Sequence, residues 1–134
     1  MELQVGVKAL LKNKDGKYLL VRRSSDKYPE VGAKRDIVGG RIEPGSTLLE
    51  NLKREVREEV NLDLVEEPKL IAAQDILRSP EKHVVRLTYV GEIDGEPQLD
   101  NDHTEFKWFT LEEMKGSENL DDYFSELLQA GRFS

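Results

Sequence analysis

Three glutamates, Glu55, Glu58 and Glu59, lie close together in the stretch REVREEV. Like charges at helical spacing repel one another, and converging carboxylates raise one another's pKa values unless a strong positive charge lies among them. Carboxylate oxygens are good ligands for Mg²⁺ or Mn²⁺, and Mg²⁺ usually keeps waters and substrate phosphates in its shell. The spacing therefore predicts a divalent cation site that works on a phosphate compound.

The alternative is that these glutamates only form surface ion pairs with Arg54, Arg57 and other nearby cations. Such pairs are common and contribute about 0 to 1 kcal/mol each. A carboxylate that flanks a core-facing stripe is costly to desolvate unless it is paired, which favours the cation site.

The helix that carries the glutamates is predicted to begin at Ser46 or Thr47 and to end near Asn61. Thr47 and Glu50 match a T-x-x-E capping box, and Asn tolerates the left-handed conformation of a helix C-terminus. At about 100° per residue, the apolar residues form a core-facing stripe about 120° wide. Its members are Leu48, Leu49, Leu52, Val56 and Val60.

On the same wheel, Glu59 lies inside the stripe and Glu55 on its edge, with Glu58 about 60° farther round. None of the three is expected to face away from the core, whereas Arg54 and Arg57 occupy the opposite half. Upstream, Gly39 and Gly40 directly follow a short apolar piece. Glycine allows close backbone approach, so a glycine carbonyl can reach an ion beside the helix.

Elements that position these residues follow from the apolar patterns. Strands are expected over 3–11, 18–23, 37–38, 70–76, 83–93 and 106–109, a surface loop over 24–34, and shorter helices over 111–115 and 120–130. Strands with one long central helix and a terminal helix indicate an α/β (α+β) fold in which helices pack on a mixed sheet.

Composition excludes several classes. The length of 134 residues suits a single domain over 1–134, and the absence of cysteine excludes disulfides and thiolate metal sites. A net charge of −7 without a Lys/Arg block argues against nucleic-acid polymers. No segment approaches the roughly 20 apolar residues that span a bilayer, and none resembles a secretion signal, so we expect a cytoplasmic protein without a membrane partner.

The stretch GGRIEPGSTLLENLKREVREEVNL resembles the box of the Nudix (MutT-like) hydrolase family, G-x5-E-x7-R-E-U-x-E-E-x-G-U, where U is aliphatic. Gly40 matches the first glycine, Arg54-Glu55-Val56 the R-E-U, Glu58-Glu59 the paired acids and Leu62 the last aliphatic. The box covers 23 of the 134 residues. The resemblance implies the α/β/α sandwich of the family, with a mixed β-sheet between helices.

The box departs from the family pattern at two positions, where Ser46 replaces the first glutamate and Asn61 the second glycine. Ser46 removes a carboxylate that helps to hold the metal site in relatives. Upstream, Arg35 and Val38 stand where relatives often carry Trp and Pro.

The resemblance implies a Nudix pyrophosphohydrolase that depends on Mg²⁺ (or Mn²⁺). Its expected reaction is hydrolysis of the diphosphate linkage of a nucleoside di- or triphosphate derivative, with an NTP or dNTP, oxidised or not, giving NMP and pyrophosphate. By this resemblance Glu55, Glu59 and the carbonyl of Gly40 bind metal, Glu58 binds metal or acts as the base, and Arg54 holds a glutamate in place.

Other candidates have two readings each. Asp102 either adds a ligand or base or is a loop acid. Arg22 and Arg23 end a strand that leads toward Gly39, and alternation directs only one of them inward, to bind phosphate or to form a surface ion pair. His83 and His103 are expected to be ordinary polar side chains. The remaining aromatic pair, Trp108 and Phe109, either stacks on a base or packs in the core.

The substrate alternatives are ADP-ribose or a sugar nucleotide, and the alternative of another class is a nucleotide-binding module weakened in turnover by Ser46. Loop shape decides the base, the sugar and the phosphorus attacked, so the sequence leaves them open. It also leaves open whether the protein is a monomer or a homodimer.

Overall fold

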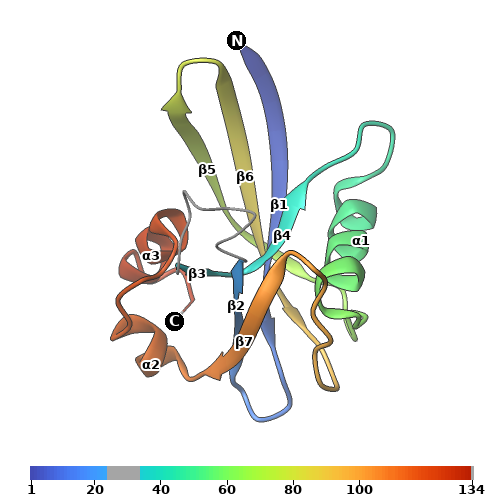
Figure 1. Cartoon of the computed structure of the whole chain (residues 1–134), viewed down its shortest axis with the longest axis vertical. Coiled ribbons are helices and arrows are strands. Elements are labelled where there is room, and N and C mark those ends of the chain that lie inside the picture. The colour runs from blue at the N-terminus through green and yellow to red at the C-terminus, as the bar shows by residue number, and fades with distance from the viewer. Residues whose placement is uncertain (24–33, 134) are drawn as a thin grey trace.

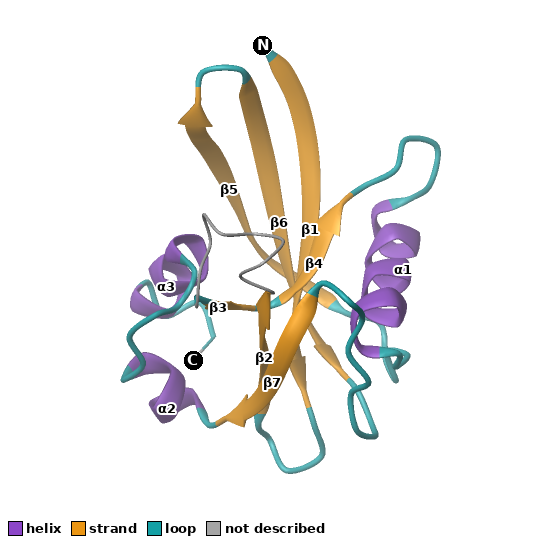
Figure 2. Ribbon diagram, in the orientation of Figure 1, coloured by secondary structure: helices purple, strands orange, loops and turns teal. Residues whose placement is uncertain are grey.

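The computed structural model describes residues 1–23 and 34–133. Seven strands form one curled mixed sheet with helices on both faces (Figures 1 and 2). The strands are β1 (Glu2–Lys12), β2 (Tyr18–Arg23), β3 (Arg35–Asp36), β4 (Val38–Arg41), β5 (Lys69–Ser79), β6 (Lys82–Glu92) and β7 (His103–Phe109). The helices are α1 (Leu48–Val60), α2 (Leu111–Lys115) and α3 (Asp122–Gln129). This is the α/β arrangement that the sequence predicts, with one short strand, β3, that the sequence analysis does not predict.

Strand β1 is the central strand of the sheet. It pairs in parallel with β6 along its whole length and antiparallel with β4 and β2 on its other edge, while β5 and β7 add to β6 and β2. Alternate β1 residues serve opposite faces: Val7 and Ala9 pack toward α1, and Leu10 packs toward α2 and α3. Burial on both faces explains the nearly continuous apolar run of this strand.

Helix α1 confirms its predicted ends. Thr47 is the N-cap, and its side chain and that of Glu50 form the reciprocal capping box. Asn61 is the C-cap in the left-handed conformation, with φ 57°. Leu52, Val56 and Val60 are fully buried against the sheet.

The helical wheel is wrong for one member of the stripe, since Leu48 is 38% exposed. A wheel gives the direction of a side chain but not the extent of the neighbouring sheet, and the first turn of α1 is not part of the α1-side core. At the other end of the chain, α3 begins at Asp122 rather than Leu120, because the side chain of Asp121 accepts the N–H groups of Tyr123 and Phe124 as N-cap.

Most of the predicted loop over 24–34 lies outside the described residues. The β5–β6 hairpin and the start of β1 extend beyond the helices, at the top of Figure 1. No helix within the described ranges combines the length and the apolar character needed to cross a membrane.

Candidate active site

The two glycines of β4 lie directly against the acidic face of α1. The N–H of Gly39 donates to Oε2 of Glu59 at 2.9 Å. A Cβ added at Gly40 would lie 2.8 Å from Oε2 of Glu55, so a side chain there would displace this carboxylate. The sequence predicts close approach at this glycine pair, and the structure shows carboxylates as the groups that approach.

The three glutamates differ in their surroundings. Glu59 is only 5% exposed, and the side chain of Glu55 is 13% exposed. The side chain of Glu58 is 56% exposed, so the wheel places it too near the core. Glu55 and Glu59 thus face β4, whereas Glu58 lies at the solvent side of the same site.

Burial raises the pKa of Glu59 to about 8. Attraction from Lys8 opposes this rise, repulsion and a hydrogen bond from Glu55 add to it, and Arg23 opposes it more weakly. Two carboxylates in contact disfavour each other's ionisation, and here the nearby Lys8 and Arg23 do not cancel the effect of burial. Without a bound metal ion, the raised pKa of Glu59 therefore favours its protonated form at neutral pH.

Arg54 connects the glutamates, as the resemblance implies. Its Nη1 lies 3.0 Å from Oε1 of Glu55 and 3.5 Å from Oε2 of Glu58. Its Nη2 donates to Oδ1 of Asn51 at 2.8 Å. The guanidinium of Arg54 therefore contacts the carboxylates of the site, whereas the wheel places this residue on the solvent half of the helix.

Asn51 is a residue that sequence reasoning missed. It is 1% exposed, its Oδ1 also accepts the N–H of Glu43, and its Nδ2 donates to the carbonyl of Thr47. It fixes the loop before α1 and orients Arg54. The available signal was its position beside the apolar stripe, one turn before Glu55, where a buried polar side chain needs partners.

A histidine from β7 completes the surroundings of Glu59. Nε2 of His103 lies 3.2 Å from Oε1 of Glu59, and its Nδ1 lies 2.6 Å from Oδ1 of Asp100. His103 is 8% exposed, so it is more than the ordinary polar side chain that we expected. Asp102 donates its N–H to Oδ1 of Asp100, and the loop acid that contacts this histidine is Asp100.

A cleft of about 390 Å³ opens beside the glycines. Arg23 lines it, whereas Arg22 pairs with Glu105 at 3.1 Å, so only one of the two arginines points inward, as alternation requires. Deeper in the cleft, Lys8 and Arg86 both bind the carboxylate of Asp36 at 3.1 Å.

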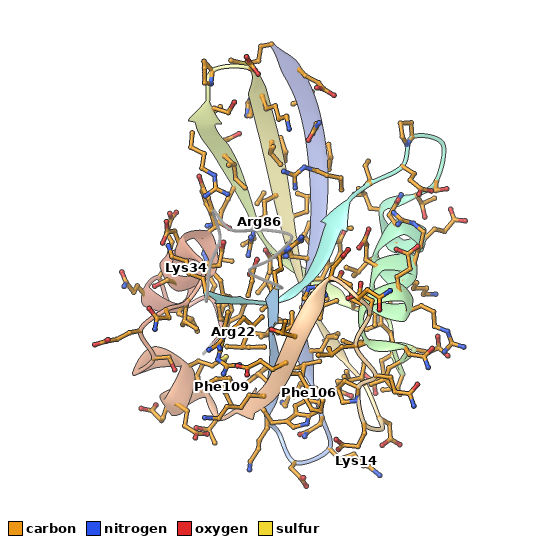
Figure 3. All side chains as sticks on the ribbon, in the orientation of Figure 1. Lys14, Arg22, Lys34, Arg86, Phe106 and Phe109 are labelled. Atoms are coloured by element: carbon orange, nitrogen blue, oxygen red, sulfur yellow. The ribbon has the colours of Figure 1, made fainter. Side chains whose placement is uncertain are left out.

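The Asp36 cluster lies on the sheet face toward α3, with Arg86 over the middle of the sheet in Figure 3. Burial alone would raise the pKa of Asp36, but Lys8 and Arg86 lower it to about 2. The signal in the sequence was Lys8, a charged residue within the apolar run of β1 that alternation directs away from α1.

The remaining candidates are structural. Phe109 is 4% exposed in the core under α2 and α3, and Trp108 packs against the core under α1. Packing is therefore what the structure shows for this aromatic pair. His83 pairs with Asp75 at 2.7 Å on the β5–β6 hairpin, away from the glutamates.

The residues at β4 and α1 fit a divalent cation. The carboxylates of Glu55 and Glu59 are in contact beside the two glycines of β4, and burial raises the pKa of Glu59. In the described arrangement no three acidic or imidazole groups are yet close enough to hold an ion. Glu58 lies one helical position before Glu59, with an exposed side chain that contacts Arg54 at 3.5 Å.

The fold is a curled mixed sheet between helices, a layered α/β architecture, with an acidic helix packed against a glycine strand. A family model described as NUDIX domain matches residues 2–128. The chain therefore belongs to the Nudix hydrolase family, whose members act on nucleoside diphosphate derivatives and generally use divalent metal ions. It is a Nudix pyrophosphohydrolase, as the box predicts.

Solved structures agree with this family. The chain is similar to the MutT protein from Methanosarcina mazei Go1, with 30% identity, a TM-score of 0.84 and coverage of 96% of this chain and 92% of that one. It is also similar to the MutT Nudix hydrolase from Burkholderia pseudomallei, with 25% identity, a TM-score of 0.80 and coverage of 96% and 98%. A search of curated protein sequences found no match.

Proposed function

We propose that the protein hydrolyses the diphosphate linkage of a nucleoside triphosphate, oxidised or not, to the nucleoside monophosphate and pyrophosphate. The observation that supports this is the contact of Glu55 and Glu59 with Gly39 and Gly40 at the mouth of a cleft lined by basic side chains. The glutamates, which would bind a cation, thus lie beside lysine and arginine side chains, which would bind an anion. A metal-bound diphosphate carries both charges.

Glu55, Glu59 and the carbonyl of Gly40 are proposed to hold Mg²⁺ or Mn²⁺, with Glu58 as a further ligand or as the base. A divalent ion bound there would neutralise phosphate charge and acidify water. Arg54 orients the carboxylates of Glu55 and Glu58. Arg23, at the end of β2, binds a phosphate oxygen of the substrate. Gly39 fixes one oxygen of Glu59 and His103 contacts the other, so this carboxylate has a defined orientation.

The test is a panel of NTPs, dNTPs, oxidised nucleotides and ADP-ribose at alkaline pH with Mg²⁺ or Mn²⁺, with separate measurement of phosphate, pyrophosphate and nucleoside monophosphate. We expect pyrophosphate from a triphosphate. Release of AMP and ribose phosphate from ADP-ribose at a higher kcat/KM would instead assign the sugar-nucleotide reaction. No metal-dependent product from any compound would remove the proposal.

Glu58→Gln is expected to abolish measurable turnover, a loss of about 10²- to 10⁴-fold, because the amide neither accepts the water proton nor adds negative charge at the metal. The side chain is exposed, so folding should be unchanged, and circular dichroism checks this. Arg57→Gln on the same helix is the control, because Arg57 pairs with Asp63 on the surface. Full activity in Glu58→Gln would exclude this residue from the mechanism.

Ser46→Glu is expected to preserve or raise kcat/KM. Ser46 is exposed and directly precedes the N-cap of α1. Its described contact is made by the backbone carbonyl, which accepts a hydrogen bond from Nδ2 of Asn51, so a longer side chain should leave this contact in place. The added carboxylate restores the box and lies near the positive end of the helix dipole. Ser46→Gln, which adds length without charge, is the control. A loss of activity in the glutamate variant alone would contradict the expectation.

A further inference from the structure

Basic side chains outnumber acidic ones in the cleft beside Gly39 and Gly40. The described residues that line it include the cations Lys8, Arg23, Arg41, Arg78, Lys82 and Arg86 and the carboxylates of Asp36 and Asp121. Both carboxylates are already used, since Lys8 and Arg86 pair with Asp36 and Arg86 also pairs with Asp121. Arg41, Arg78 and Lys82 form no ion pair with either of these two carboxylates.

The unneutralised charge lies toward the β5–β6 hairpin. Nε of Arg41 donates to the neutral Oε1 of Gln4 at 2.9 Å, and Arg78 lies over the ring of Tyr123. Neither Arg41 nor Lys82 has an ion pair with any carboxylate that the structure describes. Burial and then repulsion from Arg23, Arg78 and Arg86 lower the pKa of Arg41. A chain of net charge −7 that concentrates cations in this way is suited to an anionic ligand.

Arg41 extends over β1 within the cleft. Its Nη1 lies beside Gly6, 3.4 Å from the place where a Cβ would be. Deeper in the cleft, Arg86 is 5% exposed, and its Nε is buried without a hydrogen-bond partner among the described residues. Buried N–H groups are normally satisfied, which indicates an acceptor from a ligand or from water.

The register of the sheet gives the length of the cationic wall. Gly39 lies opposite Lys8 of β1, Arg41 opposite Gly6, and Lys82 opposite Glu2. At about 3.3 Å per residue, the backbone of Lys82 is roughly 20 Å along β1 from that of Gly39. A diphosphate at the glycines is too short to reach Lys82, so its charge does not account for the far end of the wall.

We propose that Arg41, Arg78 and Lys82, here called the distal cationic patch, bind a phosphate group that the substrate carries beyond the diphosphate at the acidic helix. This proposal rests on the proposed function and narrows its substrate class to nucleotides that bear a further phosphomonoester or diphosphate on the remote sugar or leaving group. The cleft volume of about 390 Å³ lies within the range of small-molecule sites, which favours a compact nucleotide.

The test is calorimetric binding to the metal-free full chain, with ligands that differ only in the remote phosphate. NADH and NADPH form one pair, and GTP and its 3′-diphosphate derivative form the other. We expect the more phosphorylated member of at least one pair to bind about 10-fold more tightly, since hydrogen bonds between a cation and a phosphate are stronger than neutral ones. Added NaCl should reduce this ratio because the patch is exposed.

The variant with Arg41→Gln and Lys82→Gln is expected to reduce the affinity ratio to below about 3-fold. Lys14→Gln is the matched control and should retain the ratio, because Lys14 pairs with Asp94 at the opposite end of the molecule (Figure 3). Thermal melting verifies that the variants fold. Equal affinities within both pairs, no binding of any ligand, or a ratio that survives in the double variant would each overturn the proposal.

These outcomes are independent of turnover. A metal-free affinity ratio that depends on the distal cationic patch supports the subsite even if the metal-loaded protein cleaves none of the four ligands. Conversely, metal-dependent cleavage of nucleotides without an affinity ratio leaves the proposed function in place and removes the subsite.

Discussion

Glu59→Gln is expected to lower kcat/KM by about 10³-fold or more while making the metal-free protein more stable at alkaline pH. The loss of activity follows from the loss of a negative charge beside Glu55, where the cation is proposed to bind. The amide keeps the packing, because its oxygen still accepts the N–H of Gly39 and its NH₂ group faces His103.

The gain in stability follows from the pKa of Glu59, which is raised from 4.5 to about 8 in the folded chain. A group of this kind contributes its full stability below its unfolded pKa and loses it as the pH rises through the folded value. Between pH 4.5 and 8 the wild type is therefore progressively destabilised relative to a variant with a neutral side chain.

Urea unfolding at pH 5 and at pH 9 in the presence of a chelator measures this difference. The free energy of unfolding of the wild type should fall between the two pH values by several kcal/mol more than that of Glu59→Gln. Glu58→Gln is the matched control, since its exposed side chain should leave the pH dependence of the wild type unchanged. Equal pH dependence in wild type and Glu59→Gln would show that Glu59 is ionised without a metal.

Gly39→Ala is expected to destabilise the fold by more than about 3 kcal/mol or to prevent folding. The backbone of Gly39 has φ 145°, and an added Cβ would lie 2.1 Å from the carbonyl oxygen of Val7 and 2.7 Å from Cα of Lys8. Both obstacles are backbone of β1, the central strand, which cannot move without breaking its pairing with β6.

Gly45→Ala separates the cost of the backbone conformation from the cost of the steric clash. Gly45 also has a positive φ, 97°, but nothing lies within 4 Å of an added Cβ. The conformational strain alone should cost about 1 to 2 kcal/mol. Thermal and urea unfolding of the two variants check the comparison. A similar small cost in both would mean that β4 moves away from β1, which would also release Glu59.

The sequence by itself determined the elements and the chemical type of the site. Thr47, Glu50 and Asn61 fix the ends of α1 through local hydrogen bonds and backbone preference, so their effect is readable from the chain. The fixed spacing of Gly40, Glu55 and Glu59 also identified the family, because one helix and one strand carry all three.

Some local inferences failed because they depend on neighbours. Leu48 and Glu58 are exposed although the wheel places them on or near the core-facing side. Periodicity describes a helix alone, whereas burial depends on where the adjacent sheet ends. The wheel likewise places Arg54 on the solvent half of the helix, whereas its guanidinium bonds to the buried Asn51.

Only the tertiary structure decided which distant residues meet. His103 reaches Glu59 because β7 pairs with β2 beside the glycine strand, and the cations of the cleft come from β1, β2, β4, β5 and β6. No run of the sequence is basic, yet parallel pairing of β1 with β6 brings Lys8 and Arg86 to one face. Basic residues that are far apart in the sequence form one binding surface only because the strand register places them on the same face of the sheet. Composition does not contain this information.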